Sequence, residues 1–93
     1  MITHIVLFKL NNPEDAHEVK QRLDALPAQI AEIKHYDVGI NILSSERNYD
    51  VSLISQFETL ETMEAYQVHP AHKDFVDYIK PRAASIIAVD YES

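Results

Sequence analysis

The sequence predicts an α+β protein with the element order β-α-β-β-α-α-β, a ferredoxin-like fold in which helices cover one face of a four-stranded antiparallel sheet. Three observations support this prediction. Four segments have the apolar patterning of strands, and prolines mark the ends of helical segments. A chain of 93 residues with 46% hydrophobic side chains is long enough for one core only, so we expect a single domain over residues 1–93.

The chain begins with a predicted strand and a helix. Residues 2–10 alternate in polarity and are rich in β-branched and aromatic side chains, which is typical of a strand. Asn12 and Pro13 then supply a helix cap and a proline at the first helical position. Apolar residues follow at helical spacing as far as Pro27, which marks the expected end of the helix.

Two further strands are expected in the middle of the chain. The second strand is predicted over residues 34–43 and the third over residues 49–58. The polar segment 44–48 between them resembles a turn. Together with the first two elements, they give the order β-α-β-β.

The second half of the chain predicts two helices in succession. Thr59 can cap the first, whose apolar face would carry Leu60, Met63 and Tyr66. Pro70 ends this helix, because the residue before a proline is pushed out of the α region, and the same proline can begin the next helix.

The chain is predicted to close with a helix and a strand. The last helix places Phe75, Val76 and Ile79 on its buried side and is interrupted or kinked by Pro81. Residues 86–91 form the expected fourth strand.

The predicted strands are apolar on both faces. In the first strand Val6 and Phe8 share one face, while Ile5 and Leu7 share the other, and the third and fourth strands have the same property. Half-buried antiparallel strands normally carry a polar outer face. Too little chain remains to cover a second apolar face, so we expect a homodimer in which two sheets pack face to face about a two-fold axis.

Composition excludes several classes of function. The absence of cysteine excludes disulfides and thiolate chemistry and is consistent with a cytoplasmic protein. The formal net charge of −7 argues against nucleic acid and membrane surfaces as partners. A single glycine leaves no phosphate-cradling loop. No apolar stretch approaches the length of a membrane span, and the N-terminal segment lacks the basic region of a signal peptide.

Three side chains are predicted to converge between the helices and the sheet. His4 shares the face of Val6 and Phe8 in the first strand. His72 begins the buried stripe of the last helix, and Tyr66 lies on the buried stripe of the helix before it. Two imidazoles and a phenol are suited to acid–base work near neutral pH, because one imidazole can take a proton while the others polarise a carbonyl.

A structural role is the alternative interpretation of these residues. A histidine on an apolar face is commonly a hydrogen-bonded core residue, and His69 can serve as a helix cap. His69 and His72 are three residues apart, but without a paired carboxylate they do not predict a zinc site. His17 and His35 have polar neighbours and are expected at the surface. We expect neither a metal nor another cofactor.

The chain resembles the stress-responsive A/B barrel (Dabb) family over essentially its whole length. The matching residues are the opening His-Ile-Val-Leu-Phe-Lys of residues 4–9, Tyr-Asp-Val-Ser-Leu of residues 49–53, Phe57, the Tyr-x-x-His-Pro-x-His run of residues 66–72 with the Phe-Val that follows, and Val-Asp-Tyr of residues 89–91. This family consists of small dimeric α+β barrels, which agrees with the dimer predicted from strand patterning.

The resemblance also implies an activity. Plant cyclases of the olivetolic acid cyclase type, which are similar to this chain, close a linear poly-β-keto thioester by aldol condensation without a metal. By this resemblance His72 would be the general base, Tyr66 a hydrogen-bonding tyrosine and His4 the histidine of the first strand. The sequence departs from these cyclases at Val51, where they carry a further active-site histidine, so the pocket would be drier here. Its expected apolar lining consists of Val51, Val6, Phe8, Phe75 and Val76.

Three functions remain open from the sequence. The first is a dimeric cyclase-like or lyase-like enzyme that acts on a small apolar or β-keto ligand. The second is a non-catalytic small-molecule-binding or stress-response protein on the same fold, since fold alone does not determine function. The third is a cofactor-free monooxygenase, because related dimeric barrels include such enzymes.

Overall fold

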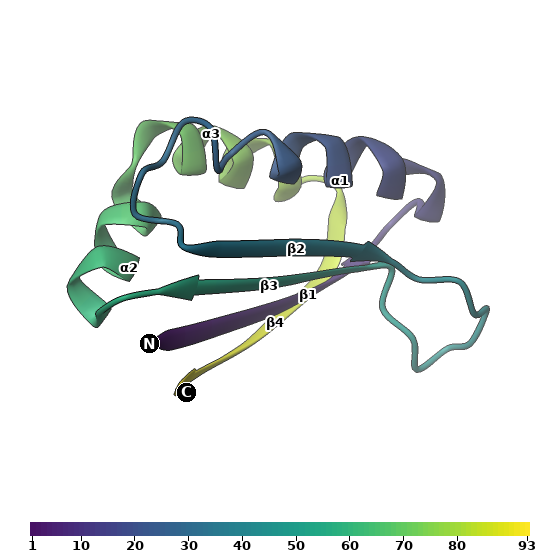
Figure 1. Ribbon diagram of the computed structural model, residues 1–93. Coiled ribbons are helices and arrows are strands. Elements are labelled where there is room, and N and C mark those ends of the chain that lie inside the picture. The colour runs from purple at the N-terminus through teal and green to yellow at the C-terminus, as the bar shows by residue number, and fades with distance from the viewer.

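The computed structural model describes residues 1–93 and has the predicted order of elements. Along the chain these are β1 (Ile2–Leu10), a 3₁₀ helix (Pro13–Asp15), α1 (Ala16–Asp24), β2 (His35–Ile40), β3 (Val51–Phe57), α2 (Leu60–Val68), α3 (Pro70–Ile79) and β4 (Ala83–Glu92). The strands form one antiparallel sheet in the order β2-β3-β1-β4. All helices lie on one face of this sheet (Figure 1), so the ferredoxin-like α+β fold is confirmed.

Side-chain caps begin the helices where the sequence places them. Asn12 accepts a hydrogen bond from the backbone N–H of Glu14 at 3.1 Å, and Pro13 follows it. Thr59 forms a capping box with Thr62, in which each side chain accepts from the backbone N–H of the other. None of the helices is both long and apolar enough to cross a membrane.

The strand ends differ from the predicted ones. β2 and β3 are shorter than expected, because the chain leaves the sheet after Asn41, whose N–H still donates to the Asp50 carbonyl at 2.9 Å, and forms a loop. In that loop the Asn41 side chain bonds to the backbone of Leu43 instead of continuing the strand. β4 begins at Ala83, three residues earlier than predicted, because it pairs with the whole of β1. α3 ends at Ile79, so Pro81 terminates the helix rather than kinking it.

The core lies between the helices and one face of the sheet. Its buried side chains come from alternate positions of the strands and from the inner faces of the helices. Met63 and Tyr66 of α2 belong to it, as predicted. Leu60 does not, because it occupies the first turn of α2 beyond the sheet edge and is exposed.

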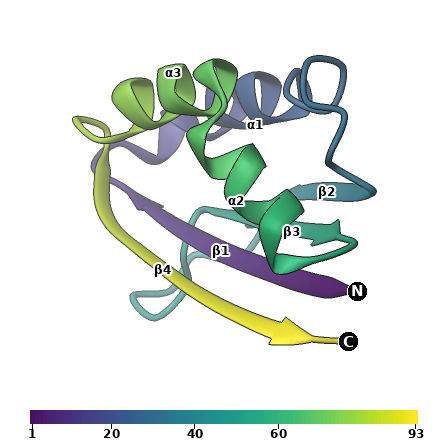
Figure 2. The same ribbon diagram turned by 90° about the vertical axis from the view of Figure 1, so that its left-hand side faces the viewer.

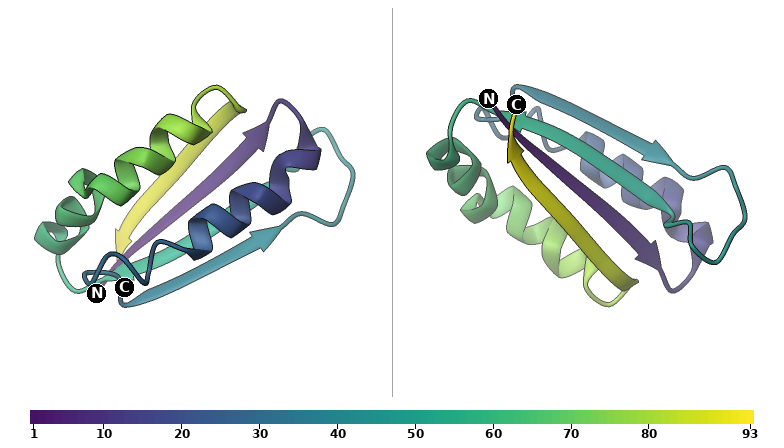
Figure 3. Two further views of the ribbon diagram at one scale, coloured as in Figure 1. Left: turned by 90° about the horizontal axis from the view of Figure 1, so that it is seen from above. Right: turned by 90° about the horizontal axis from the view of Figure 1, so that it is seen from below.

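The opposite face of the sheet is apolar and uncovered. It carries Ile5, Leu7, Ile54, Ile87 and Val89, a set that we call the outer face. Ile5 lies opposite both Ile54 and Val89, and Leu7 lies opposite Ile87, so these side chains form one continuous patch. In the view from below, no helix crosses this face (Figure 3).

The two chain ends lie side by side. The Ser93 N–H donates to the carbonyl oxygen of Met1 at 2.9 Å, and the Thr3 hydroxyl donates to the Ser93 hydroxyl at 2.8 Å. Figure 2 shows β1 and β4 running together to these ends. The last strand is therefore fastened to the first along its whole length.

Candidate functional site

An apolar cavity of about 330 Å³ lies between the helices and strands β1, β3 and β4. Ten of its 14 lining residues are hydrophobic, and its size is that of a small ligand pocket. Ile86 and Ala88 of β4 line it and are themselves exposed, so the cavity reaches the surface along this strand. We call it the His/Tyr cavity; its lining includes the sequence-predicted residues His4, Val6, Phe8, Tyr66, His72, Phe75 and Val76.

His72 is held at the wall of this cavity by its place in α3. Pro70 begins the helix and His69 caps it, which puts His72 in the first turn with its ring against Tyr66, at 4.4 Å between ring centroids. Its Nδ1 lies 3.0 Å from the carbonyl oxygen of Gln67. A carbonyl can only accept, so Nδ1 carries the proton in this contact and Nε2 keeps a lone pair.

The environment of His72 favours the neutral ring. Burial lowers its pKa from the ordinary value of 6.5, and the neighbouring His4 acts in the same direction. The hydrogen bond to Gln67 opposes this shift but does not cancel it. At neutral pH the side chain is therefore a base with a free nitrogen, which is the form that can accept a proton from a ligand.

Tyr66 lies at the back of the cavity and is 1% exposed. Its hydroxyl is hydrogen-bonded to the hydroxyl of Tyr36 on β2 at 3.0 Å, and its ring also packs on Phe57. Burial raises the pKa of both tyrosines, so both remain protonated at neutral pH. If Tyr36 donates in this contact, Tyr66 retains its own proton for a ligand oxygen.

His4 forms a pair with an acidic residue on the neighbouring strand. It lies opposite Asp90 in the register of β1 and β4, and its Nδ1 contacts the Asp90 carboxylate. This contact fixes the orientation of the imidazole, because Nδ1 is turned toward the carboxylate. His4 is buried, whereas Asp90 is exposed along β4.

Val51 does not line the His/Tyr cavity. It lies on the inner face of β3 opposite Phe8, but it is buried in the core next to β2. Leu53, two residues further along the same face, lines the cavity instead. The alternation of β3 correctly predicts that Val51 faces the helices. It does not predict which inner-face residue of β3 lines the cavity, because that depends on where the helices cross the strand.

Sequence reasoning missed Tyr36 and Asp90. Tyr36 shares the inward alternation of Val38 on β2, a signal that could have placed it beside Tyr66. Asp90 depends on the register of β4 against β1, which connects residues 86 positions apart and has no local signal. His69 caps α3 by accepting from the Ala71 N–H at 3.0 Å, which is the structural alternative considered for it.

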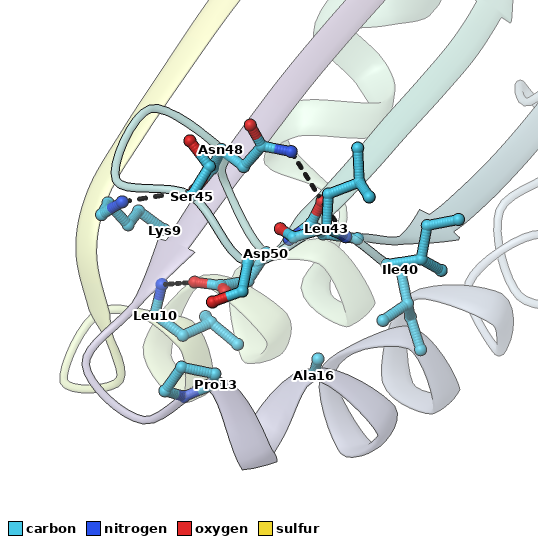
Figure 4. Close-up of a pocket in the computed structure, with 12 residues that line it drawn as sticks. Lys9, Leu10, Pro13, Ala16, Ile40, Leu43, Ser45, Asn48 and Asp50 are labelled. Carbon is cyan, nitrogen blue, oxygen red and sulfur yellow. Dashed lines mark hydrogen bonds between the residues drawn. The ribbon is translucent and has the colours of Figure 1, made fainter.

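A second cavity lies beside the loop between β2 and β3 (Figure 4). It measures about 400 Å³ and is bounded by Leu10, Ala16 and Ile40. Its acidic group, Asp50, accepts a hydrogen bond from the Leu10 N–H at 2.7 Å and thereby supports the local backbone. No His, Tyr or Cys lines this cavity, whereas the His/Tyr cavity brings two histidines and a tyrosine together. No group of three or more His, Cys, Asp or Glu side chains is placed to hold a metal ion.

Comparison with known protein families identifies the chain. The family model described as Stress responsive A/B Barrel Domain matches residues 2–93 of the chain. The chain belongs to this family. The match spans nearly the whole of the fold, from the first residue of β1 to the end of the chain. It confirms the resemblance inferred from the His-Ile-Val-Leu-Phe-Lys and Tyr-x-x-His-Pro-x-His segments.

Solved structures agree with membership in the stress responsive A/B barrel family. A dimeric ferredoxin-like protein of unknown function from Thermobifida fusca is 33% identical, with a TM-score of 0.87 over 99% of this chain and 90% of that chain. A dimeric protein of unknown function and ferredoxin-like fold from Bacteroides fragilis is 32% identical, with a TM-score of 0.85 over 99% of this chain and 95% of that chain.

A more distant match shows the fold alone. The hydroxynitrile lyase from Passiflora edulis is 14% identical, with a TM-score of 0.83 over 97% of this chain and 90% of that chain. A search of curated proteins finds no match to the chain.

Proposed function

We propose that this A/B barrel protein binds a small, largely apolar ligand with an acidic C–H next to a carbonyl, and that His72 removes the proton. The proposal depends mainly on the protonation and surroundings of the His72 ring. Its Nδ1 is bonded to the Gln67 carbonyl, its pKa is lowered by burial, and its ring lines an apolar cavity of about 330 Å³.

The proposed chemistry is enolate formation followed by carbon–carbon bond formation, as in a cofactor-free cyclase of the aldol type. Nε2 of His72 takes the proton of the activated carbon, and the electron pair of the broken C–H bond moves to the carbonyl oxygen. Tyr66 donates to that oxygen while accepting from Tyr36, and His4, oriented by Asp90, holds the ligand. The enolate carbon then attacks a second carbonyl of the ligand, the π bond of that carbonyl breaks, and its oxygen takes the proton from His72.

The ligand is expected to be apolar at one end and enolisable at the other. Aliphatic and aromatic side chains make up most of the cavity wall, while His4, Tyr66 and His72 supply its central polar groups. A β-keto thioester with an alkyl tail has this distribution of polarity. The valine at position 51, buried outside the cavity, adds no polar group to it.

Proton exchange tests the proposal without knowledge of the natural substrate. The probe is the N-acetylcysteamine thioester of 3-oxooctanoic acid in deuterated buffer, with α-hydrogen exchange followed by proton NMR. We expect the protein to accelerate exchange above the buffer rate, and His72→Gln to remove about 100-fold or more of that acceleration, as is usual for loss of a general base. His69→Asn, which keeps a helix-capping side chain outside the cavity, is the matched control and should exchange like the wild type.

A binding protein without catalysis is the second candidate, and one observation favours it. The Tyr66 hydroxyl is already bonded to Tyr36, as expected for a buried phenol with a purely structural role. Binding of the same thioester with no exchange above buffer would support this candidate and reject the enzyme. Exchange that is unchanged in His72→Gln would reject the role assigned to His72.

We also propose that the chain is a homodimer formed through the outer face. Five aliphatic side chains are left uncovered there, and the two relatives of about one-third identity are both dimeric. A two-fold axis would pack this face against its own copy and remove the exposed apolar area from water.

A further inference from the structure

The His/Tyr cavity extends along β1 and α3. His4 and Phe8 line it from β1 and lie four residues apart, which is about 13 Å along a strand. His72 and Lys80 line it from α3 and lie eight residues apart, which is about 12 Å along a helix. The cavity therefore has two ends, and different side chains occupy them.

The two ends can be assigned because β1 and α3 run in the same direction (Figures 2 and 3). At one end the two histidines meet, since the charge of His4 adds to burial in lowering the pKa of His72. At the other end the chain leaves α3 and meets the end of β1, where the Asn11 N–H donates to the Arg82 carbonyl oxygen at 2.8 Å. Lys80 lies two residues before Arg82 and so belongs to this second end.

Lys80 is the only lysine or arginine that lines the cavity, and no aspartate or glutamate lines it. It takes part in none of the ion pairs, and the lysines that donate side-chain hydrogen bonds are Lys9 and Lys20. A lysine beside apolar surface lays its methylene groups along that surface and keeps its ammonium group in water. Because Lys80 is exposed, we expect its charge at the mouth of the cavity.

Two cations lie close together at this end of an otherwise acidic chain. Arg82 stacks its guanidinium on the Tyr78 ring, 4.1 Å from the ring centre, and donates to the Tyr78 carbonyl oxygen at 2.7 Å. Of the nearby carboxylates, Glu18 accepts from the Tyr78 hydroxyl at 2.6 Å, and Asp77 forms no ion pair with Lys80. A chain of net charge −7 repels anions in general, so an anion can bind only beside such local cations.

We propose that the ligand of the His/Tyr cavity carries a carboxylate at the end of its apolar tail and that Lys80 binds this group. This inference rests on the proposed function, because it concerns the same ligand. The activated carbon would lie at His72 and the carboxylate about 12 Å away at the mouth. Apolar side chains such as Val6 and Val76 line the cavity between these ends and suit a chain of methylene groups. The ligand class is therefore the half thioester of a 3-oxo dicarboxylic acid.

The test is isothermal titration calorimetry with two ligands that differ only at the far end of the chain. One is the N-acetylcysteamine thioester of 3-oxodecanedioic acid, with its free carboxylate remote from the keto group. The other is the same thioester of 3-oxodecanoic acid, which has a methyl group there. Lys80→Met removes the charge, and Lys80→Arg keeps it. Lys73→Met is the matched control, because Lys73 is also an exposed lysine of α3 but does not line the cavity.

We expect the wild type to bind the carboxylate ligand about fivefold more tightly than the methyl-ended ligand, which is typical of an ion pair in contact with water. Lys80→Met should lose this preference, whereas Lys80→Arg and Lys73→Met should keep it. Added sodium chloride should reduce it. The same preference in Lys80→Met as in the wild type would overturn the role of Lys80, and a wild type that prefers the methyl-ended ligand would overturn the carboxylate.

The binding measurement separates this inference from the proposed catalysis. A carboxylate preference that depends on Lys80, without exchange of α-hydrogens above the buffer rate, would support the inference and reject the enzyme. A wild type that binds neither ligand would overturn both the inference and the proposed function.

Discussion

At the scale of single residues, two opposing effects act on the pKa of His72. Burial beside Tyr66 disfavours its charged form, while the hydrogen bond to the Gln67 carbonyl favours it. Burial prevails, so the pKa of His72 in the folded protein lies below 6.5. A histidine that resists protonation in the folded state makes stability depend on pH.

This dependence has a defined sign. Above pH 6.5 neither the folded nor the unfolded chain protonates His72 to a large extent, so it contributes no pH dependence. As the pH falls, the unfolded chain takes up the proton first, and the free energy of unfolding decreases until the pH reaches the folded pKa. We expect His72→Gln to lose less stability than the wild type between pH 7 and about pH 5. Urea denaturation at fixed protein concentration measures this, with exposed His17→Gln as the control. Equal losses in the wild type and His72→Gln would contradict it.

The pair of hydroxyls at the back of the cavity provides a second prediction. Tyr36→Phe and Tyr66→Phe should each lower the free energy of unfolding by about 1 kcal/mol, because each leaves the other hydroxyl without its partner. The double variant should cost less than the sum, since both single changes remove the same hydrogen bond. Additive losses in a double-mutant cycle would show that the two hydroxyls are not coupled.

The sequence predicted those side chains of the site that are positioned by a single strand or helix. Strand alternation put His4 on the inner face, and helical spacing put Tyr66 and His72 on buried stripes. It did not predict Asp90 or Tyr36, because their positions depend on how one strand pairs with another.

At the scale of elements, local caps determine where the helices begin. The capping box of Thr59 and Thr62 satisfies backbone groups at the start of α2 that would otherwise lack partners. Thr59→Ala should lower the free energy of unfolding by about 1 kcal/mol, and Thr59→Ser should restore most of it. Thermal or urea denaturation of both variants tests this prediction, which fails if alanine is as stable as threonine.

Strand ends were less predictable than helix starts. The apolar Ile42 and Leu43 suggested that β2 continues to residue 43, yet the strand ends at Ile40. Lys9 and Asn41 bind the backbone of the following loop and divert it from the sheet. Apolar composition alone cannot distinguish a residue that continues a strand from one that a loop presents to solvent.

At the scale of the whole molecule, the apolar outer face of the sheet is not covered by any other part of the chain. We expect the protein to sediment as a dimer and Leu7→Asp to sediment as a monomer, because the substitution places a charge in the centre of that face. Val68→Asp on exposed α2 should remain dimeric. Sedimentation equilibrium measures this, and a dimer that survives Leu7→Asp would show that the outer face is not the interface.

The pairing of β1 with β4 has a consequence for folding. β1 lies inside the sheet between β3 and β4, and its contact with β4 joins residues farther apart in the sequence than its contact with β3. Contacts between residues far apart in the sequence are slow to form, so the edge of β1 that faces β4 is the part of the sheet we expect to pair late. The same delay holds for the His/Tyr cavity, since Ile86 and Ala88 in its wall and Asp90 beside His4 all belong to β4. A chain from which β4 was deleted would expose this edge of β1, and such an edge is a template for aggregation.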